Sequence, residues 1–98
     1  MANRETFATG SLNVTTAGVA EQLPDQSIPD GFRAIIAAKL DNTDEIYIGN
    51  SKANAEDADE RFAALKAGDW IALRVRNINQ IFVTSVVTGE GISWIVEV

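Results

Sequence analysis

Apolar and polar residues alternate along much of the chain, and this period of two predicts β-strands with one buried face. The alternation is clearest in the last third of the chain, where we predict strands over residues 70–76, 80–87 and 92–98. Residues 77–79 and 88–91 separate these strands and are rich in Asn and Gly, which favour turns. The inward stripe that this phase predicts consists of Ile71, Leu73, Val75, Ile92, Trp94, Val96 and Val98.

The first half of the chain shows the same alternation, and it predicts strands over residues 10–16, 19–23, 32–40 and 45–49. We expect the first two of these strands to form a hairpin about Thr16, Ala17 and Gly18. The stretch 32–40 contains Ala, Lys and Leu, which favour helices. The spacing of its large residues and the Pro-Asp-Gly before it favour a strand. Residues 1–9 are polar and aperiodic apart from Phe7, so we predict a flexible N-terminal arm there.

The segment 54–67 is open to two interpretations. Ala55, Ala58, Phe62 and Leu65 have helical spacing, with Asn54 as a candidate cap and Gly68 as a stop. The alternative is a loop followed by a strand near residues 61–65. Because strands flank the segment, we expect a loop with about one helical turn and then a strand. In total, about eight short strands predict an all-β fold, an antiparallel β-sandwich or small barrel, in one domain over residues 10–98.

Composition narrows the functional classes. The 98 residues carry a formal net charge of −6, which argues against nucleic-acid binding because that affinity comes largely from cations. Cysteine and histidine are absent, so disulfides, thiolate metal sites and the usual general base are excluded. No run of apolar residues approaches the ~20 needed to cross a bilayer. We therefore expect a protein made in a cytoplasm, with neither a nucleic-acid nor a membrane partner.

Candidate chemistry is sparse. Glu56, Asp57, Asp59 and Glu60 form an acidic cluster that could supply oxygen ligands to Ca²⁺, but the glycine and the spacing of a calcium loop are missing. A solvated loop face is the interpretation we favour. Pairs of carboxylates occur by chance among fourteen acidic residues, and no helix follows Gly89 and Gly91 to make a phosphate site. We predict that the protein is not an enzyme and needs no cofactor or metal.

The residues expected on the outer faces of the strands say more about function than the candidate chemical groups do. If the inward stripe is correct, Trp70, Ile95 and Ile35 point outward, where they either form a partner surface or are covered by loops. Arg74 and Arg76 share the outward side with Trp70. They could stack on a base or sugar, but a cross-strand salt bridge or a subunit contact is the reading we favour. Tyr47 and Trp94 are expected in the core or an interface. The predicted interface residues are Phe7, Ile35, Trp70, Arg74, Arg76 and Ile95.

Four motifs carry a family resemblance: TAGVA at 16–20, NTDEIYIG at 42–49, LKAGDWIALRVRNINQIF at 65–82 and GEGISW at 89–94. The stretches around them resemble small virion structural proteins of tailed bacteriophages, over nearly the whole chain after residue 10. The motifs are patterns of strands and turns and contain no catalytic group. The chain departs from the family pattern at AEDADER, residues 55–61, where many relatives have a short neutral loop.

The resemblance implies a jelly-roll-like β-sandwich located in the virion, on the capsid surface. The implied function is that of a capsid decoration or cement protein, which binds and stabilises the lattice of the major capsid protein, commonly as a homotrimer. Two other functions remain open from the residues. One is a tail or fibre module that binds a receptor or glycan, and the other is a free-standing lectin-like or inhibitor domain.

Overall fold

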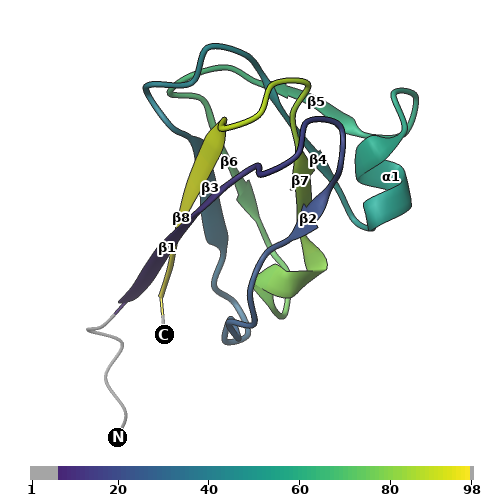
Figure 1. The fold of residues 1–98 in the computed structure, drawn as a ribbon. Coiled ribbons are helices and arrows are strands. Elements are labelled where there is room, and N and C mark those ends of the chain that lie inside the picture. The colour runs from purple at the N-terminus through teal and green to yellow at the C-terminus, as the bar shows by residue number, and fades with distance from the viewer. Residues whose placement is uncertain (1–6, 98) are drawn as a thin grey trace, which may run out of the picture.

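A computed structural model describes residues 7–97, apart from the side chains of Ala63 and Ala64. Within this range eight strands, one short α-helix and one turn of 3-10 helix follow each other along the chain (Figure 1). The elements are β1 (Phe7–Asn13), β2 (Glu21–Gln22), β3 (Ala34–Ala38), β4 (Ile46–Gly49), α1 (Lys52–Glu56), β5 (Phe62–Leu65), β6 (Trp70–Leu73), η1 (Ile78–Gln80), β7 (Phe82–Thr84) and β8 (Gly91–Glu97).

The strands form a sandwich of two antiparallel four-stranded sheets. Sheet A has the order β1-β8-β3-β6 and sheet B the order β2-β7-β4-β5. In each sheet, strands from the first half of the chain pair with strands from the second half, as β1 with β8, β2 with β7, β3 with β6 and β4 with β5. This is the pairing of one long antiparallel hairpin rolled into two layers. The all-β sandwich predicted from the sequence is thereby confirmed.

The core lies between the two sheets, and strand alternation decides which residues enter it. In sheet A the predicted stripe is confirmed at six positions, since Ile92, Trp94 and Val96 are buried and Ile71, Leu73 and Val75 are half-buried against them. Its last member, Val98, lies outside the described residues. Sheet B contributes the alternate residues of β4 and β7. These sheet B residues are Ile46, Ile48 and Val83, and the other members of the core come from further strands and connecting segments: Val14, Leu23, Ile28, Ala34, Ile36, Ala38, Leu65, Ile78 and Ile81.

The predicted N-terminal hairpin is wrong. Strand β1 begins at Phe7 instead of Gly10, so residues 7–9 belong to sheet A, while residues 1–6 of the predicted arm lie outside the described part of the chain. Strand β2 lies in sheet B, paired with β7. The chain crosses between the sheets alongside the segment before β8, because Val14 N–H donates to the carbonyl oxygen of Glu90 and Gly89 N–H to that of Val14. Because of these bonds, residues 14–20 lead from β1 toward sheet B and do not turn back along β1.

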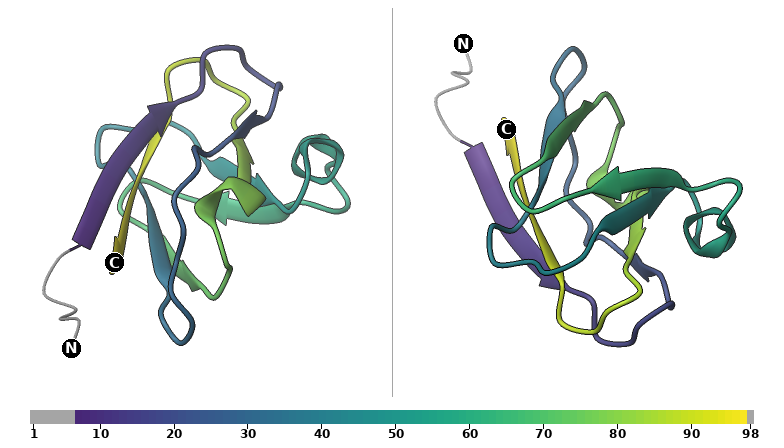
Figure 2. Two further views of the ribbon diagram at one scale, coloured as in Figure 1. Left: turned by 90° about the horizontal axis from the view of Figure 1, so that it is seen from below. Right: turned by 90° about the horizontal axis from the view of Figure 1, so that it is seen from above.

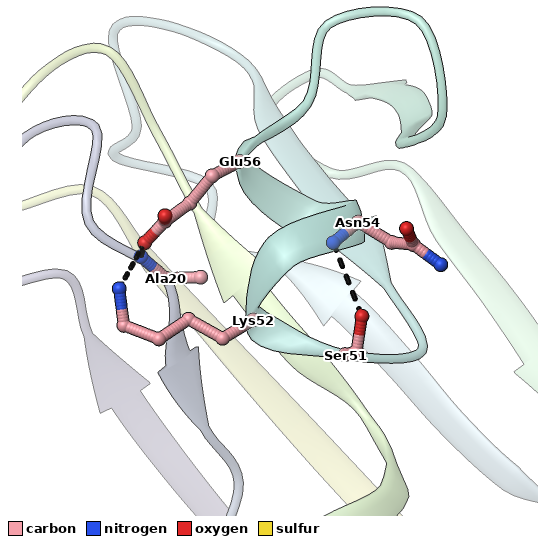
Figure 3. A network of polar contacts seen from close by, with 5 residues as sticks. All are labelled: Ala20, Ser51, Lys52, Asn54 and Glu56. Atoms are coloured by element: carbon pink, nitrogen blue, oxygen red, sulfur yellow. Dashed lines mark hydrogen bonds and ion pairs between the residues drawn. The ribbon is translucent and has the colours of Figure 1, made fainter.

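The ambiguous segment contains both a helical turn and a strand, as expected. Helix α1 begins after Ser51, whose hydroxyl oxygen accepts from the N–H of Asn54 (Figure 3), so Ser51 rather than Asn54 caps it. The helix lies close against β4, because a Cβ on Gly49 would be 2.4 Å from the backbone nitrogen of Ala55. The Glu56 carboxylate then reaches the backbone N–H of Ala20, which fastens α1 to the segment before β2 (Figure 3).

Strand β7 is shorter than predicted. The segment 80–87 was expected to be extended throughout, yet η1 occupies 78–80 and the strand covers Phe82–Thr84 alone. Asn77 stabilises η1, since its side-chain oxygen accepts from the N–H of Asn79 and a capping box forms with Gln80. Within the described chain, no helix is long and apolar enough to span a membrane.

Candidate interaction surface

The outer faces of the two sheets differ in what covers them. On sheet B, α1 packs against β4 and β7, and Thr84 of β7 is 1% exposed although it points away from the core. Figure 2 shows α1 on the far side of sheet B from β1 and β8. On sheet A, no helix lies over the outer face in the described part of the chain, and four large apolar side chains there are exposed: Phe7, Ile35, Trp70 and Ile95.

Strand register places the outward residues of sheet A in rows across the four strands. One row contains Thr9, Ile95, Ile35 and Ala72, and the next contains Ser11, Ser93, Ala37 and Trp70. None of these eight side chains carries a charge. We call these residues, together with Phe7 at the end of β1, the sheet A face.

The sheet A face is hollow at its centre. Ser11, Ser93 and Ala37 have short side chains, and a shallow depression of about 490 Å³ lies above them. Ile35 and Ile95 stand beside each other at its margin, with 38% and 40% of their surface exposed. At the β6 edge Trp70 is 62% exposed. The face therefore offers both a recess and protruding apolar side chains, a relief that suits a folded partner surface.

Charge is distributed unevenly around the sheet A face. Arg33, Arg74 and Arg76 follow the outward phase of β3 and β6 at one end, and Lys39 does so at the other. These are four of the seven cations in the described residues, whereas Glu97 is the single one of thirteen described acids at an outward position of these strands. The protein as a whole has a net charge of −6. The sheet A face is thus uncharged itself, with a cationic margin on an acidic molecule.

The structure brings the predicted interface residues together on this side of the molecule. Phe7, Ile35, Trp70 and Ile95 come from the four different strands of sheet A, and Arg74 and Arg76 follow β6 in exposed positions. The cross-strand salt bridge considered for the two arginines is absent, since the ion pair found among the described residues joins Lys52 to Glu56.

Sequence reasoning missed the small and basic members of the surface. Thr9, Ser11 and Ser93 occupy outward positions of their strands, but a single sequence does not reveal that β1 and β8 are neighbours. Without that pairing, short polar side chains give no sign of lying beside Ile35. Arg33 and Lys39 lie at the two ends of the face, and this position follows from the sheet order.

The acidic residues at the end of α1 and just after it serve the fold in part. Glu56 accepts hydrogen bonds from Lys52 Nζ at 2.5 Å and from Ala20 N at 2.8 Å. The Lys52 hydrogen bond, followed by that from Ala20, lowers the pKa of Glu56 below its ordinary value. Asp57 accepts from the N–H of Asp59 through its side chain. Within residues 7–97, no cluster of three or more His, Cys, Asp or Glu side chains is arranged to hold a metal ion.

The two aromatic residues singled out in the sequence have different surroundings. Trp94 is buried beneath Gly10, where a Cβ would lie 2.3 Å from the indole Cζ2 atom. Tyr47 is half-buried, with the Arg61 guanidinium 3.6 Å from its ring centre. Burial, together with a hydrogen bond to Glu45, raises the pKa of Tyr47. Trp94 is therefore a core residue, and Tyr47 belongs to the packing of sheet B.

Comparisons of this chain with protein families, with curated proteins and with solved structures find no match. The functional argument consequently rests on the surface, on the arrangement of the strands and on the sequence motifs.

Proposed function

We propose that this protein is a structural protein of a tailed-bacteriophage virion, a capsid decoration protein that binds the lattice of the major capsid protein through the sheet A face. The observation that carries the proposal is the bare apolar face of sheet A, set against the helix-covered face of sheet B. A contiguous exposed apolar patch with a charged margin is typical of a protein-binding surface.

The chemistry of the surface indicates what its partner looks like. Burial of Trp70, Phe7, Ile35 and Ile95 supplies a nonpolar driving force of about 25 cal/mol per Å². The arginines at the margin favour an acidic rim on the partner, because complementary charge steers association and fixes orientation. The partner is therefore a folded protein surface with an apolar centre and acidic surroundings.

The arrangement of strands supports the same proposal. Two sheets with the orders β1-β8-β3-β6 and β2-β7-β4-β5 form a rolled hairpin, an arrangement described for eight-stranded jelly rolls. Jelly rolls occur in viral capsid proteins and also in lectins, so the fold alone does not select a function. The resemblance of the sequence motifs to small virion proteins favours the capsid. By the same resemblance we propose a homotrimer as the unit that binds the shell.

Co-sedimentation with capsids tests the proposal directly. The purified protein is mixed with empty shells assembled from the major capsid protein of the virus that encodes it, and the pelleted fraction is measured against concentration. We expect saturable binding, which Ile95→Glu weakens by tenfold or more, on the order of 1.4 kcal/mol. The matched control is Val19→Glu, because Val19 is also 40% exposed but lies outside the sheet A face. Its binding stays at the wild-type level.

Two outcomes would overturn the proposal. One is that the wild-type protein stays in the supernatant at all concentrations. The other is that Val19→Glu and Ile95→Glu weaken binding equally, which would show that added negative charge, and not the face, is responsible. A glycan array run with the same protein separates the alternative, since specific glycan binding without shell binding would assign it to a tail or fibre module.

A further inference from the structure

Strand β1 is an edge strand that lacks the usual protection against pairing with another strand. It is the outer strand of sheet A, with β8 along one side and no described strand along the other (Figure 2). Its seven residues, FATGSLN, contain neither a charge nor a proline. Proteins ordinarily block such an edge with lysine, proline, a bulge or a very short strand.

The other three sheet edges are protected in these ways. Strand β2, at one edge of sheet B, has two residues. Strand β5, at the other edge, is flanked by Arg61 and Lys66, and its pairing with β4 contains a bulge. Strand β6, the second edge of sheet A, has four residues and is followed by Arg74 and Arg76. Strand β1 is thus the longest edge strand in the described chain, and it has none of these protective features.

Backbone hydrogen bonds fix which residues of β1 face the open edge. The N–H and the carbonyl oxygen of Val14 both form hydrogen bonds with the segment before β8. The carbonyl oxygen of Gly91 in β8 accepts from the N–H of Lys39, so Gly91 bonds toward β3 and away from β1. In antiparallel sheets these directions alternate from residue to residue. Even-numbered residues of β1 therefore bond β8, and odd-numbered residues direct their N–H and carbonyl groups outward. The groups at the open edge belong to Phe7, Thr9, Ser11 and Asn13.

We propose that β1 pairs antiparallel with β1 of a second copy of this chain, about a two-fold axis at Gly10. Bonding pairs must join odd-numbered residues, so the register that uses all seven positions places Thr9 opposite Ser11 of the second copy and Phe7 opposite Asn13. Four such pairs supply about eight backbone hydrogen bonds, two for each pair. The strand is self-complementary in length and in bonding pattern.

Side chains agree with this register. On the outer face each Thr9 lies across from Ser11 of the second copy, a hydroxyl pair of the kind that stabilises neighbouring strands. At the axis two Gly10 residues face each other as a non-bonded pair, where backbones approach to about 4.5 Å. Because paired residues share a face, the two copies form one eight-stranded sheet, and their sheet A faces become continuous on the same side.

The test is the mass of the particle in solution, measured by size-exclusion chromatography with light scattering over a range of concentrations. A two-fold contact gives an even number of 10.6-kDa chains. If the edge contact acts alone, the wild type contains two chains, and if the proposed trimer also forms, it contains six. Ser11→Pro removes an N–H that points to the open edge while sparing the bonds to β8, and we expect it to halve the mass in either case.

Two further variants make the result decisive. Ser11→Thr keeps the N–H and the hydroxyl, and its mass equals that of the wild type. Ser11→Lys leaves the backbone N–H groups of β1 in place but adds a charge at the edge, which opposes pairing with a second copy. It should therefore halve the mass even if the proline variant fails to fold. Circular dichroism checks that each variant is folded.

A wild-type particle of one or three chains overturns the edge pairing. So does a mass that falls with Ile95→Glu but not with Ser11→Lys, because the contact would then use the sheet A face. Failure of the proposed shell binding leaves this mass unchanged, since shell binding does not enter the measurement.

Discussion

Glu56 is the residue that ties α1 to the rest of the molecule. Its carboxylate receives the Lys52 ammonium from one turn earlier in the helix and the backbone N–H of Ala20 from the segment before β2 (Figure 3). Ala20 is buried, so its N–H has few alternatives to this carboxylate. A charged acceptor suits both donors better than a neutral one. The position of α1 over sheet B therefore depends on the ionised form of a single side chain.

We predict that the stabilising contribution of Glu56 depends on pH. Its pKa is lowered in the folded protein, so the contribution is complete above the unfolded-state pKa and is lost as the pH falls through the folded-state pKa. In urea unfolding, Glu56→Gln should be less stable than the wild type at pH 7. The difference should shrink steadily as the pH falls through the folded-state pKa, where the carboxylate of the wild type becomes protonated.

The control for this measurement is Glu60→Gln. It removes the same charge from an exposed side chain in the same segment, and this side chain makes no hydrogen bond among the described residues. A Glu56→Gln difference that stays constant between pH 7 and pH 3 would contradict the role of the ionised carboxylate.

Among the elements, η1 is the shorter of the two helices, with three residues, and the side chain of its cap residue Asn77 makes several hydrogen bonds. Asn77 accepts hydrogen bonds from the N–H groups of Asn79 and Gln26, both at 2.9 Å, and its amide donates to Asp25 at 2.5 Å. One side chain thus fixes the start of η1 and holds the loop before Ile28 against it. Ile78, at the first position of η1, is completely buried in the core.

We predict that Asn77→Ala lowers the free energy of unfolding by about 2 kcal/mol, the effect of losing a cap together with a second loop contact. Urea denaturation at pH 7 measures it. Asn79→Ala is the matched control, because the Asn79 side chain makes no hydrogen bond among the described residues, and it should change stability by less than about 0.5 kcal/mol. Equal effects of the two substitutions would show that Asn77 is not the centre of this junction.

The elements also show how far a single sequence leads. Alternation locates β3, β4, β6 and β8 because each of these strands has one face in the core, so the period of two survives in the sequence. It predicts the break at residues 77–79, where η1 begins, but it does not reveal that the strand predicted over residues 80–87 covers Phe82–Thr84 alone. It also places β1 and β2 in one hairpin, since proximity along the chain was the single guide to pairing. Ile35, Trp70 and Ile95 follow from strand phase, whereas Phe7 falls in a segment predicted to be an aperiodic arm. The small members of the surface require the sheet order.

On the scale of the whole molecule, strands of the first half of the chain pair with strands of the second half. This pairing determines how many residues separate the two strands of each pair. Strands β4 and β5 are separated by residues 50–61, while β1 and β8 join the two ends of the described chain. The entropy cost of closing a loop rises with its length, so the β4–β5 pair forms at the lowest cost and the β1–β8 pair at the highest. The rolled hairpin should therefore close from β4–β5 outward, with β1 and β8 pairing last.

Two matched core substitutions test this order of folding. Ile46 in β4 and Ile92 in β8 are both fully buried, and replacement of either by Val should destabilise the protein by about 1 kcal/mol. In stopped-flow experiments across denaturant concentrations, we expect Ile46→Val chiefly to slow folding and Ile92→Val chiefly to speed unfolding. A circular permutant with its ends joined and a new opening between Asp59 and Glu60 makes β8–β1 the local pair, so the two substitutions should exchange their effects. If Ile92→Val slows folding in both chains alike, the order of pairing is not governed by loop closure.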